Sequence, residues 1–282
     1  MLQTTPSLSR NVGKASRAVY GKIAGTAIRL AERASRTTFG NVAGLRSNLD
    51  GAVEEARLRF RRRYPTDAAK TLRSIGYQAL TPVDRGVMER IRSAYATMID
   101  DEIMSRPNGH GVALRQGLCF SRIVEDLFEK IPEASAIVTD EVAAIVRAYY
   151  GTDFKIQGTS AWRIQHVPGD LFQNMDLFSN RWHCDNRPTT WLKIFVHLQD
   201  ISDADGPFHV LSLQDTRQAI KIGFANRTSY GSSLEFLNAK AYRSVGPMGS
   251  ILLTNTTRCL HRAGLAAEDH SRDMIEVKFA PV

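Results

Sequence analysis

Hydrophobic positions in the first part of the chain recur at the three- and four-residue spacing of amphipathic helices. The segment Val83–Ser105 has a single apolar stripe, made by Val87, Ile91, Tyr95, Met98 and Ile99. Residues 132–150 predict a second helix, which Pro132 opens and Gly151 closes. The stretch DAAKTLRSIGYQAL predicts a further helix that stops at Gly76, followed by a short strand. This part of the chain is therefore predicted to be mainly helical.

After Gly151 the pattern changes to short apolar segments separated by turn residues. These segments are 154–167, 189–198, 207–213, 249–254 and 273–279. Helices followed by strands predict an α+β fold, with a double-stranded β-helix (a jelly-roll or cupin-like core) flanked by helices. We assign residues 66–282 to this domain, helical over 66–150 and jelly-roll over 151–282.

Charge divides the chain near residue 65. Residues 1–65 carry 13 Lys and Arg against 4 Asp and Glu, a net charge of +9, with apolar residues at helical spacing between the bases. Residues 66–282 carry 24 against 25, a net charge of −1. We therefore predict a basic, helical N-terminal arm over 1–65. The neutral remainder argues against a nucleic-acid groove in the main domain, so a nucleic-acid partner is not expected.

Three interpretations of the arm remain open. It is a solvated, partly helical extension or a contact between subunits. Alternatively, residues 7–63 rest on anionic lipid, where apolar side chains enter the headgroups and each base adds attraction. The third interpretation is a nucleic-acid contact or a targeting peptide, which an acid-poor, Arg- and Ser-containing composition also fits. The pattern does not predict an oligomeric state.

Composition favours an intracellular protein. The chain is 43% hydrophobic and 23% charged, an ordinary globular balance. No apolar run approaches the roughly 20 residues that cross a bilayer. Three cysteines form no CxxC pair and no even framework, which is typical of a reducing compartment. We expect a cytoplasmic location, with peripheral contact on the inner face of a membrane if the arm binds lipid.

The segment RWHCDNRPTTWLKIFVHLQD contains the strongest candidate for chemistry. His183 and Asp185 are two residues apart at the start of a predicted strand, so both side chains point to one face, with Cys184 on the other. His261, at a strand end before Gly264, is the candidate third ligand. Two histidines and one carboxylate are the non-haem Fe(II) arrangement, whereas structural zinc sites fill four positions and favour cysteines.

Arg272 adds to this candidate site. It lies 11 residues beyond His261 and opens the last predicted strand. A buried guanidinium there can clamp the distal carboxylate of a diacid through two parallel hydrogen bonds. The sequence therefore predicts a metal site with a diacid co-substrate.

Taken together, these residues resemble the phytanoyl-CoA hydroxylase-like branch of the Fe(II)/2-oxoglutarate-dependent oxygenases. The resemblance covers about residues 69–281. LRSIGYQAL is similar to the family's opening helix and Gly-Tyr strand, and WHCD to its His/Asp motif. FVHLQDISDADGPFHVLS and GSILLTNTTRCLHRAG are similar to its central strands and its distal histidine segment.

The resemblance implies Fe(II), 2-oxoglutarate and O2 as cofactors and co-substrates. It further implies hydroxylation of an unactivated C–H bond, with release of succinate and CO2. His183, Asp185 and His261 would hold the metal, and Arg272 would hold the 2-oxoglutarate. The carboxylate at 185 favours hydroxylation, because halogenating relatives have a small residue there.

The sequence departs from the family pattern in three places. The family's Pro-Gly-Ser-His loop is replaced by VLSLQDT, and the hydroxyl residues expected near the co-substrate are replaced by Ala263 and Met274. Arg272 therefore needs another helper, and Lys193 is the candidate, with a solvated lysine as the alternative. Gln165, on the preceding strand, is predicted to line the 2-oxoglutarate pocket.

The substrate is the least constrained part of the prediction. Asn180, Arg181 and Arg187 flank the metal motif and are candidates for substrate contact, with a solvated rim as the alternative. A small molecule, or a lipid- or glycan-linked substrate, fits the resemblance. The rival hypothesis is a non-enzymatic jelly-roll protein that binds a metal or ligand, with a basic arm that binds membrane or nucleic acid. The remaining histidines, His197 among them, are expected to be surface or core residues.

Overall fold

The computed structural model describes residues 53–54, 56, 58, 66–99, 114–115, 118–119, 121–167, 179–185, 188, 190–222, 224 and 233–282. The basic arm predicted over 1–65, and the lipid contact predicted within it, therefore fall almost entirely outside the described residues. No helix in the described part of the chain combines the length and the hydropathy needed to span a bilayer.

The helices form close to where the sequence predicts them, with one exception. Their bounds are α3 (Asp67–Ile75), α4 (Arg85–Ile99), α5 (Leu127–Lys130), η1 (Pro132–Ile137), α6 (Asp140–Tyr150), η2 (Asp203–Asp205), α8 (Leu213–Lys221) and α9 (Ser233–Lys240). The single helix predicted over 132–150 is wrong, because a 3₁₀ turn (η1) and α6 share that range. Thr139 separates them: its backbone is extended, and its hydroxyl accepts a hydrogen bond from the Val142 N–H to cap α6.

Three sheets contain all the described strands. The large sheet is antiparallel, in the order β1-β9-β6-β11-β5-β4. Its strands are β1 (Tyr77–Leu80), β9 (Ile251–Thr254), β6 (Leu192–His197), β11 (Ser271–Pro281), β5 (Phe154–Gln165) and β4 (Ser121–Glu125). The small sheet joins β10 (His261–Arg262), β7 (Phe208–Val210) and β8 (Tyr242–Ser244). A two-stranded ribbon pairs β2 (Leu114–Arg115) with β3 (Leu118–Cys119).

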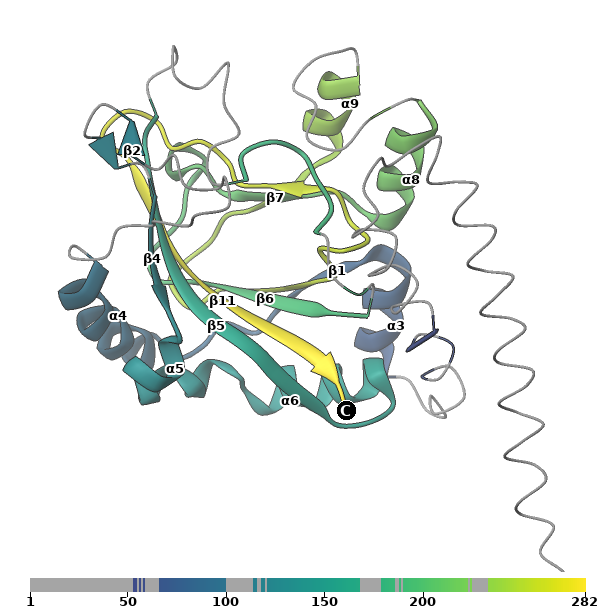
Figure 1. Cartoon of the computed structure of the whole chain (residues 1–282), viewed down its shortest axis with the longest axis horizontal. Helices are drawn as coiled ribbons and strands as arrows, with labels where there is room; N and C mark the ends of the chain where they lie inside the picture. Colours follow the sequence, from purple (N-terminus) through teal and green to yellow (C-terminus); the bar gives the residue numbers. More distant parts are fainter. Residues whose placement is uncertain are drawn as a thin grey trace, which may run out of the picture.

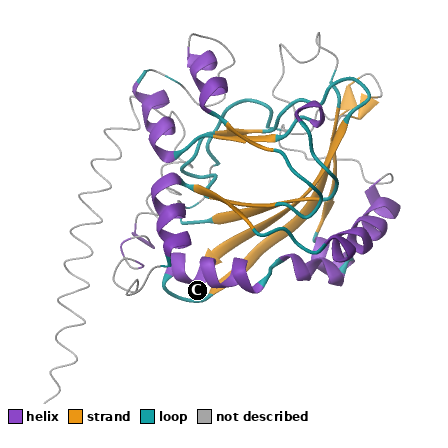
Figure 2. Ribbon diagram, turned by 180° about the vertical axis from the view of Figure 1, so that it is seen from behind, coloured by secondary structure: helices purple, strands orange, loops and turns teal. Residues whose placement is uncertain are grey.

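The two main sheets face each other, and helices cover the outer face of the large one. Figure 1 shows α4, α5 and α6 beneath the large sheet and β7 of the small sheet above it. Figure 2 shows the same layers from behind, with the space between the sheets bounded by strands above and below. This is the double-stranded β-helix with flanking helices that the sequence predicted.

The strand register shows that the two faces of the large sheet carry different kinds of side chain. Directly paired residues share a face, and successive residues alternate. Ala161, Ile275 and Val196 form one fully buried row that packs with the helices. The neighbouring row, which faces the small sheet, has Met274 and His197. The helix-facing side is therefore the main apolar core, and the polar side chains gather between the two sheets.

Gly76 ends α3 and packs against the segment that precedes His261. Its φ of 98° ends α3 in the left-handed region, as predicted for a helix stop at this position. A Cβ here would lie 2.2 Å from Cys259 Sγ and 2.9 Å from Leu213 Cγ. The Gly76 carbonyl also accepts the Asn255 N–H over 2.8 Å. Only glycine allows both the left-handed backbone and the close approach of Cys259 and Leu213. The hydrogen bond from Asn255 places the 255–259 segment against the large sheet.

Candidate metal centre and co-substrate pocket

A short antiparallel pairing brings the two histidine segments together. The His183 N–H donates to the His261 carbonyl over 3.0 Å, and the His261 N–H donates back over 2.9 Å. Two residues later, the Asp185 N–H donates to the Thr256 carbonyl over 3.0 Å. The imidazole rings consequently lie on the same side of the pair, with their centroids 4.3 Å apart.

The carboxylate of Asp185 completes a group of three potential metal ligands. Its Oδ1 atom lies 3.6 Å from Nε2 of His183 and 3.6 Å from Nε2 of His261. The ligand atoms of all three residues lie within 4.8 Å of one another. The structure thus brings together the three residues that the sequence predicted as ligands, from segments almost 80 residues apart.

Both imidazoles present the ring nitrogen that a metal needs. Nδ1 of His183 lies 2.7 Å from the Arg181 carbonyl, and Nδ1 of His261 lies 3.0 Å from the Cys259 carbonyl. A carbonyl oxygen only accepts, so each Nδ1 carries the proton and each Nε2 is the nitrogen that carries the lone pair. Neutral imidazoles held in this way are the usual metal-ligating form. The donor set therefore fits a divalent iron ion held by two nitrogens and one carboxylate oxygen.

Asp185 is held in its charged form. Burial on its own would raise its pKa, but the neighbouring Lys193 ammonium opposes burial, and the pKa lies well below its ordinary value. Lys193 Nζ lies 2.7 Å from Asp185 Oδ2 and 3.0 Å from Glu276 Oε2. The site consequently contains a charged carboxylate before any metal is added, which is the form that ligates.

Arg272 fits the role of an anion-binding residue. Its side chain, 1% exposed, points between the two sheets from the start of β11, and Nη1 donates to the Gly206 carbonyl. Nε has no hydrogen-bond partner among the described residues, and no carboxylate there forms an ion pair with it. Burial lowers the pKa of Arg272 to about 10. An unpaired guanidinium in an enclosed site is suited to a carboxylate ligand such as that of 2-oxoglutarate.

His197, predicted only as a surface or core histidine, lies buried on the same face of the large sheet as Arg272. It is 1% exposed and lies opposite Met274 on the face that carries Arg272. Nε2 contacts the Ser244 hydroxyl over 3.0 Å, whereas Nδ1 has no partner in the described part of the chain. Burial lowers the pKa of His197 to about 4, so the ring is neutral at pH 7. Period-two alternation predicted its sheet face but not its distance from Arg272.

The side chains of Lys193 and Gln165, both predicted to contact 2-oxoglutarate together with Arg272, do not lie beside the Arg272 side chain. Lys193 pairs with Lys278 in the register, six residues along β11 from Arg272, so it does not lie beside the guanidinium it was expected to assist. Gln165 pairs with Ser271 and, by alternation, points to the opposite face from Arg272. Alternation along one strand cannot reveal which residue of the next strand lies alongside.

The predicted substrate residues have mixed placements. Asn180 is 2% exposed, and its Oδ1 has no partner among the described residues. The Arg181 carbonyl orients His183, and the Arg181 side chain is half-buried. Arg187 lies outside the described residues. His209 accepts a hydrogen bond from Arg262 and His270 contacts Asp205, in agreement with structural roles.

The sequence did not single out three residues around the Asp185 carboxylate: Thr256, Glu276 and Lys278. Thr256 Oγ1 donates to Asp185 Oδ2 over 2.7 Å. Glu276 lies between Lys193 and Lys278, at 3.0 and 2.9 Å. The hydroxyl-rich run before His261 was the available signal for Thr256. Glu276 resembles an ordinary strand residue, because its partner Lys193 comes from a different strand. Lys278 contacts Glu276, two residues away on the same strand, and is connected to Asp185 only through Glu276 and Lys193.

Comparison with known proteins finds a match at the level of structure alone. No family model and no curated protein matches this chain. Among solved structures, the carbocyclase SnoK from nogalamycin biosynthesis, a non-heme alpha-ketoglutarate-dependent enzyme, is 13% identical with a TM-score of 0.52. The match covers 78% of this chain and 85% of SnoK.

Two further structures extend this comparison. EctD from S. alaskensis, solved with 2-oxoglutarate and 5-hydroxyectoine, is 16% identical with a TM-score of 0.55, covering 78% of this chain and 77% of that one. HygX from Streptomyces hygroscopicus, solved with nickel, 2-oxoglutarate and hygromycin B, is 16% identical with a TM-score of 0.51, covering 78% and 88%. The chain therefore has the fold of the non-haem, 2-oxoglutarate-dependent enzymes, as its motifs had implied.

Proposed function

We propose that this protein is an Fe(II)- and 2-oxoglutarate-dependent dioxygenase that hydroxylates an unactivated C–H bond of a small molecule. The overall reaction consumes substrate, 2-oxoglutarate and O2, and yields hydroxylated substrate, succinate and CO2. The observation that carries the proposal is a preformed His183, Asp185 and His261 ligand set that shares one interior with a buried, unpaired Arg272. A purely structural site would have no use for that guanidinium.

Each residue has a defined part in this proposal. His183, Asp185 and His261 hold the iron through three ligand atoms and leave its remaining positions open for co-substrate and oxygen. Iron bound there supplies the activation of O2 that the oxidation requires. Arg272 binds the distal carboxylate of 2-oxoglutarate, and neutral His197 offers a second polar contact nearby. Burial between the sheets excludes water and strengthens both contacts.

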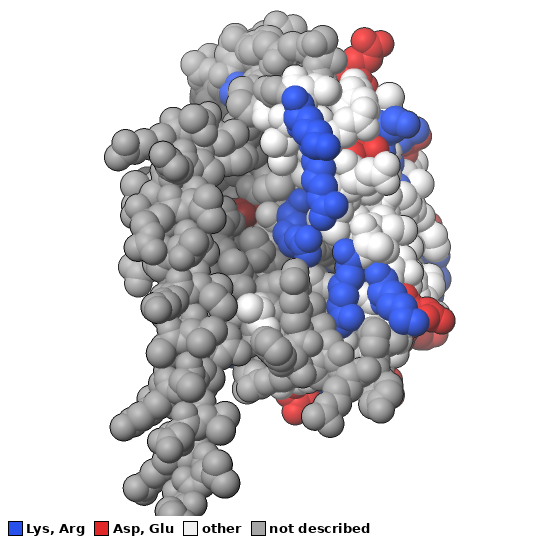
Figure 3. Space-filling view, turned by 90° about the vertical axis from the view of Figure 1, so that its right-hand side faces the viewer, with Lys and Arg blue, Asp and Glu red and all other residues white. Residues whose placement is uncertain are grey.

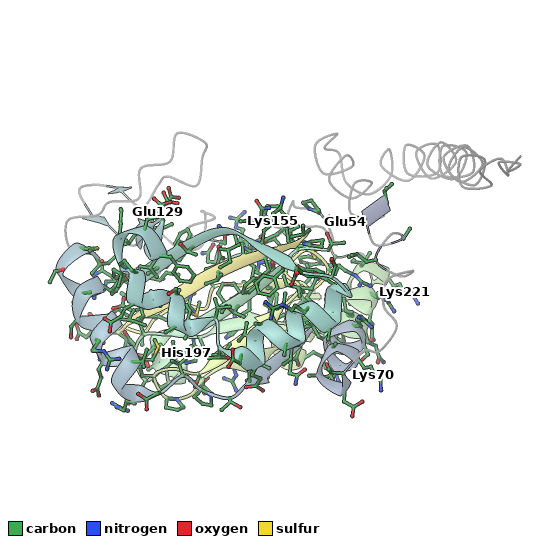
Figure 4. All side chains as sticks on the ribbon, turned by 90° about the horizontal axis from the view of Figure 1, so that it is seen from below. Glu54, Lys70, Glu129, Lys155, His197 and Lys221 are labelled. Carbon is green, nitrogen blue, oxygen red and sulfur yellow. The ribbon has the colours of Figure 1, made fainter. Side chains whose placement is uncertain are left out.

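The proposed substrate region is a cavity of about 420 Å³ at the end of β11. Its lining includes Trp191, Lys155, Gln157 and Glu54. Trp191 directly precedes β6 and is two residues before Lys193, which contacts Asp185, so we propose that the cavity opens toward the Asp185 side of the site. Figure 4 shows Glu54 and Lys155 on one side of the molecule, away from His197. An aromatic ring among polar groups suits a small, polar substrate.

The predicted substrate contacts of Asn180, Arg181 and Arg187 remain part of the proposal. Asn180 is the best supported of the three, because a buried amide oxygen without a protein partner is costly unless a ligand satisfies it. A free small molecule and a lipid- or glycan-linked one are the substrate classes that we propose. A non-enzymatic binding protein is the rival, and oxygen-dependent turnover of 2-oxoglutarate separates the two.

Peripheral binding to anionic membranes through residues 7–63 is a second part of the proposal. The net charge of +9 over residues 1–65 supports it. Figure 3 shows Lys and Arg gathered on the face where α3 and α8 lie, and α8 contributes exposed Arg217 and Lys221. The full chain should bind phosphatidylserine vesicles but not phosphatidylcholine vesicles in co-sedimentation. Replacing Arg10, Lys14, Arg17 and Lys22 with Gln should reduce binding, and unchanged binding contradicts this part.

Loss of one ligand should abolish metal binding and turnover. His183→Ala is expected to lose the roughly one equivalent of bound Fe(II) and the oxygen-dependent conversion of 2-oxoglutarate to succinate. His270→Ala is the matched control, because the His270 side chain is exposed and contacts only Asp205 among the described residues. Metal analysis and succinate chromatography check both variants. Equal succinate formation by His183→Ala and the parent would contradict the assignment of this site.

Arg272→Met should change stability and co-substrate affinity in opposite directions. Without 2-oxoglutarate, removing a buried charge that lacks a counter-ion should raise the free energy of unfolding by about 1–4 kcal/mol. The affinity for 2-oxoglutarate should fall roughly a hundredfold, because the distal carboxylate loses its partner. Urea denaturation and calorimetric titration of the metal-loaded protein measure the two quantities.

Arg163→Met is the control for this prediction. Arg163 comes from the same sheet but points to the other face, where Nε and Nη2 donate to Asp273 over 2.9 and 2.8 Å. Breaking that pair should destabilise the protein and leave the 2-oxoglutarate affinity unchanged. An Arg272→Met variant that is both less stable and unaltered in 2-oxoglutarate affinity would show that Arg272 has only a structural role.

A further inference from the structure

The two oxygens of Asp185 have different surroundings. Oδ1 faces Nε2 of both His183 and His261, at 3.6 Å each. Oδ2 accepts a hydrogen bond from Thr256 Oγ1 over 2.7 Å and contacts Lys193 Nζ over 2.7 Å. One oxygen is therefore directed at the metal position, and the other is saturated by two protein donors on the far side.

Both donors are themselves fixed in place. Lys193 lies between Asp185 and Glu276, and its side chain is only 12% exposed. Glu276 contacts Lys278 through its other oxygen at 2.9 Å, so the row of charges is neutral overall. Thr256 is held by its backbone, because its carbonyl accepts the Asp185 N–H over 3.0 Å. Asp185 cannot turn Oδ2 toward the metal without breaking two charge-assisted contacts.

The number of coordination positions gives this arrangement a consequence for the reaction. An octahedral ion has six positions, and three single-atom protein ligands leave three. A chelating 2-oxo acid would need two of these, and O2 would need the last. A carboxylate that ligates through both oxygens would occupy one position that the reaction requires. Single-oxygen ligation by Asp185 is thus a condition for turnover in the proposed function.

We propose that Lys193 and Thr256 are positioning residues that restrict Asp185 to single-oxygen ligation and so keep a coordination position free for 2-oxoglutarate. This assigns to Lys193 a role at the metal carboxylate instead of at the distal carboxylate of the co-substrate. The inference rests on the proposed function, since it takes His183, Asp185 and His261 as the metal ligands.

The test uses the full-length protein loaded with Co(II), which reports coordination by its visible absorption and does not turn over. The double variant Lys193→Met/Thr256→Val removes both donors and keeps the side-chain shapes similar. Calorimetry should find Co(II) affinity equal to or higher than that of the parent, and 2-oxoglutarate affinity about tenfold or more lower. The visible spectrum of the Co(II) protein should change before 2-oxoglutarate is added, because Asp185 then ligates through both oxygens.

Two matched variants separate positioning from charge. Lys278→Met removes one positive charge from the same row without removing a donor to Asp185. It should leave the Co(II) spectrum unchanged and have only a small effect on 2-oxoglutarate affinity, which salt suppresses. Thr256→Ser keeps the hydroxyl and should behave as the parent, whereas Thr256→Val alone should shift spectrum and affinity in the direction of the double variant.

The outcomes are distinct. Parallel losses of Co(II) and 2-oxoglutarate affinity in Thr256→Val and the double variant would overturn the proposal, since they indicate general damage to the site. An unchanged spectrum and 2-oxoglutarate affinity in both variants would overturn it as well. A parent protein that binds no Co(II), or binds Co(II) without 2-oxoglutarate, would instead contradict the proposed function itself.

Discussion

The pairing of His183 with His261 is the constraint on which the site depends. Two backbone hydrogen bonds set the imidazoles side by side, and the next bond along the pair, from Asp185 to Thr256, places the carboxylate. Backbone hydrogen bonds of this kind are rigid, so the ligand geometry exists before a metal arrives. The carbonyls that orient both Nδ1 atoms come from the same two segments. This backbone pairing therefore determines which three side chains come together, which ring nitrogen of each histidine carries the proton, and where the potential ligand atoms point.

The two faces of the large sheet differ in the side chains that they bury. The helix-facing side holds apolar rows and one well-paired ion pair, between Arg163 and Asp273. The side facing the small sheet buries Arg272 and His197 with unsatisfied nitrogens. Buried polar atoms without partners cost free energy, and native proteins tolerate them mainly where a ligand completes them. The two nitrogens of Arg272 and His197 therefore lie on the face that carries the candidate site.

The sequence predicted the fold class, the main strands and the three residues that come together as potential metal ligands, because these depend on local periodicity and on ordered motifs. It could not predict which residues of different strands lie side by side, because that depends on the strand register. Lys193 was assigned to the correct face but the wrong end of the sheet, and Gln165 to the wrong face. Thr256 and Glu276 were overlooked because each acts on a residue of another segment. The predicted helix over 132–150 is divided at Thr139, which caps α6. Composition alone does not show whether a threonine lies inside a helix or caps its start.

The central claim is that this interior holds Fe(II) and 2-oxoglutarate together, with the 2-oxo acid chelating the metal. Anaerobic addition of Fe(II) and then 2-oxoglutarate to the full chain tests this most directly, by visible absorption. A 2-oxo acid chelated to Fe(II) gives a metal-to-ligand charge-transfer band that neither component gives alone. We predict that this band appears, saturates with 2-oxoglutarate, and is absent when succinate replaces it. Saturating Fe(II) and 2-oxoglutarate without any such band would contradict the account.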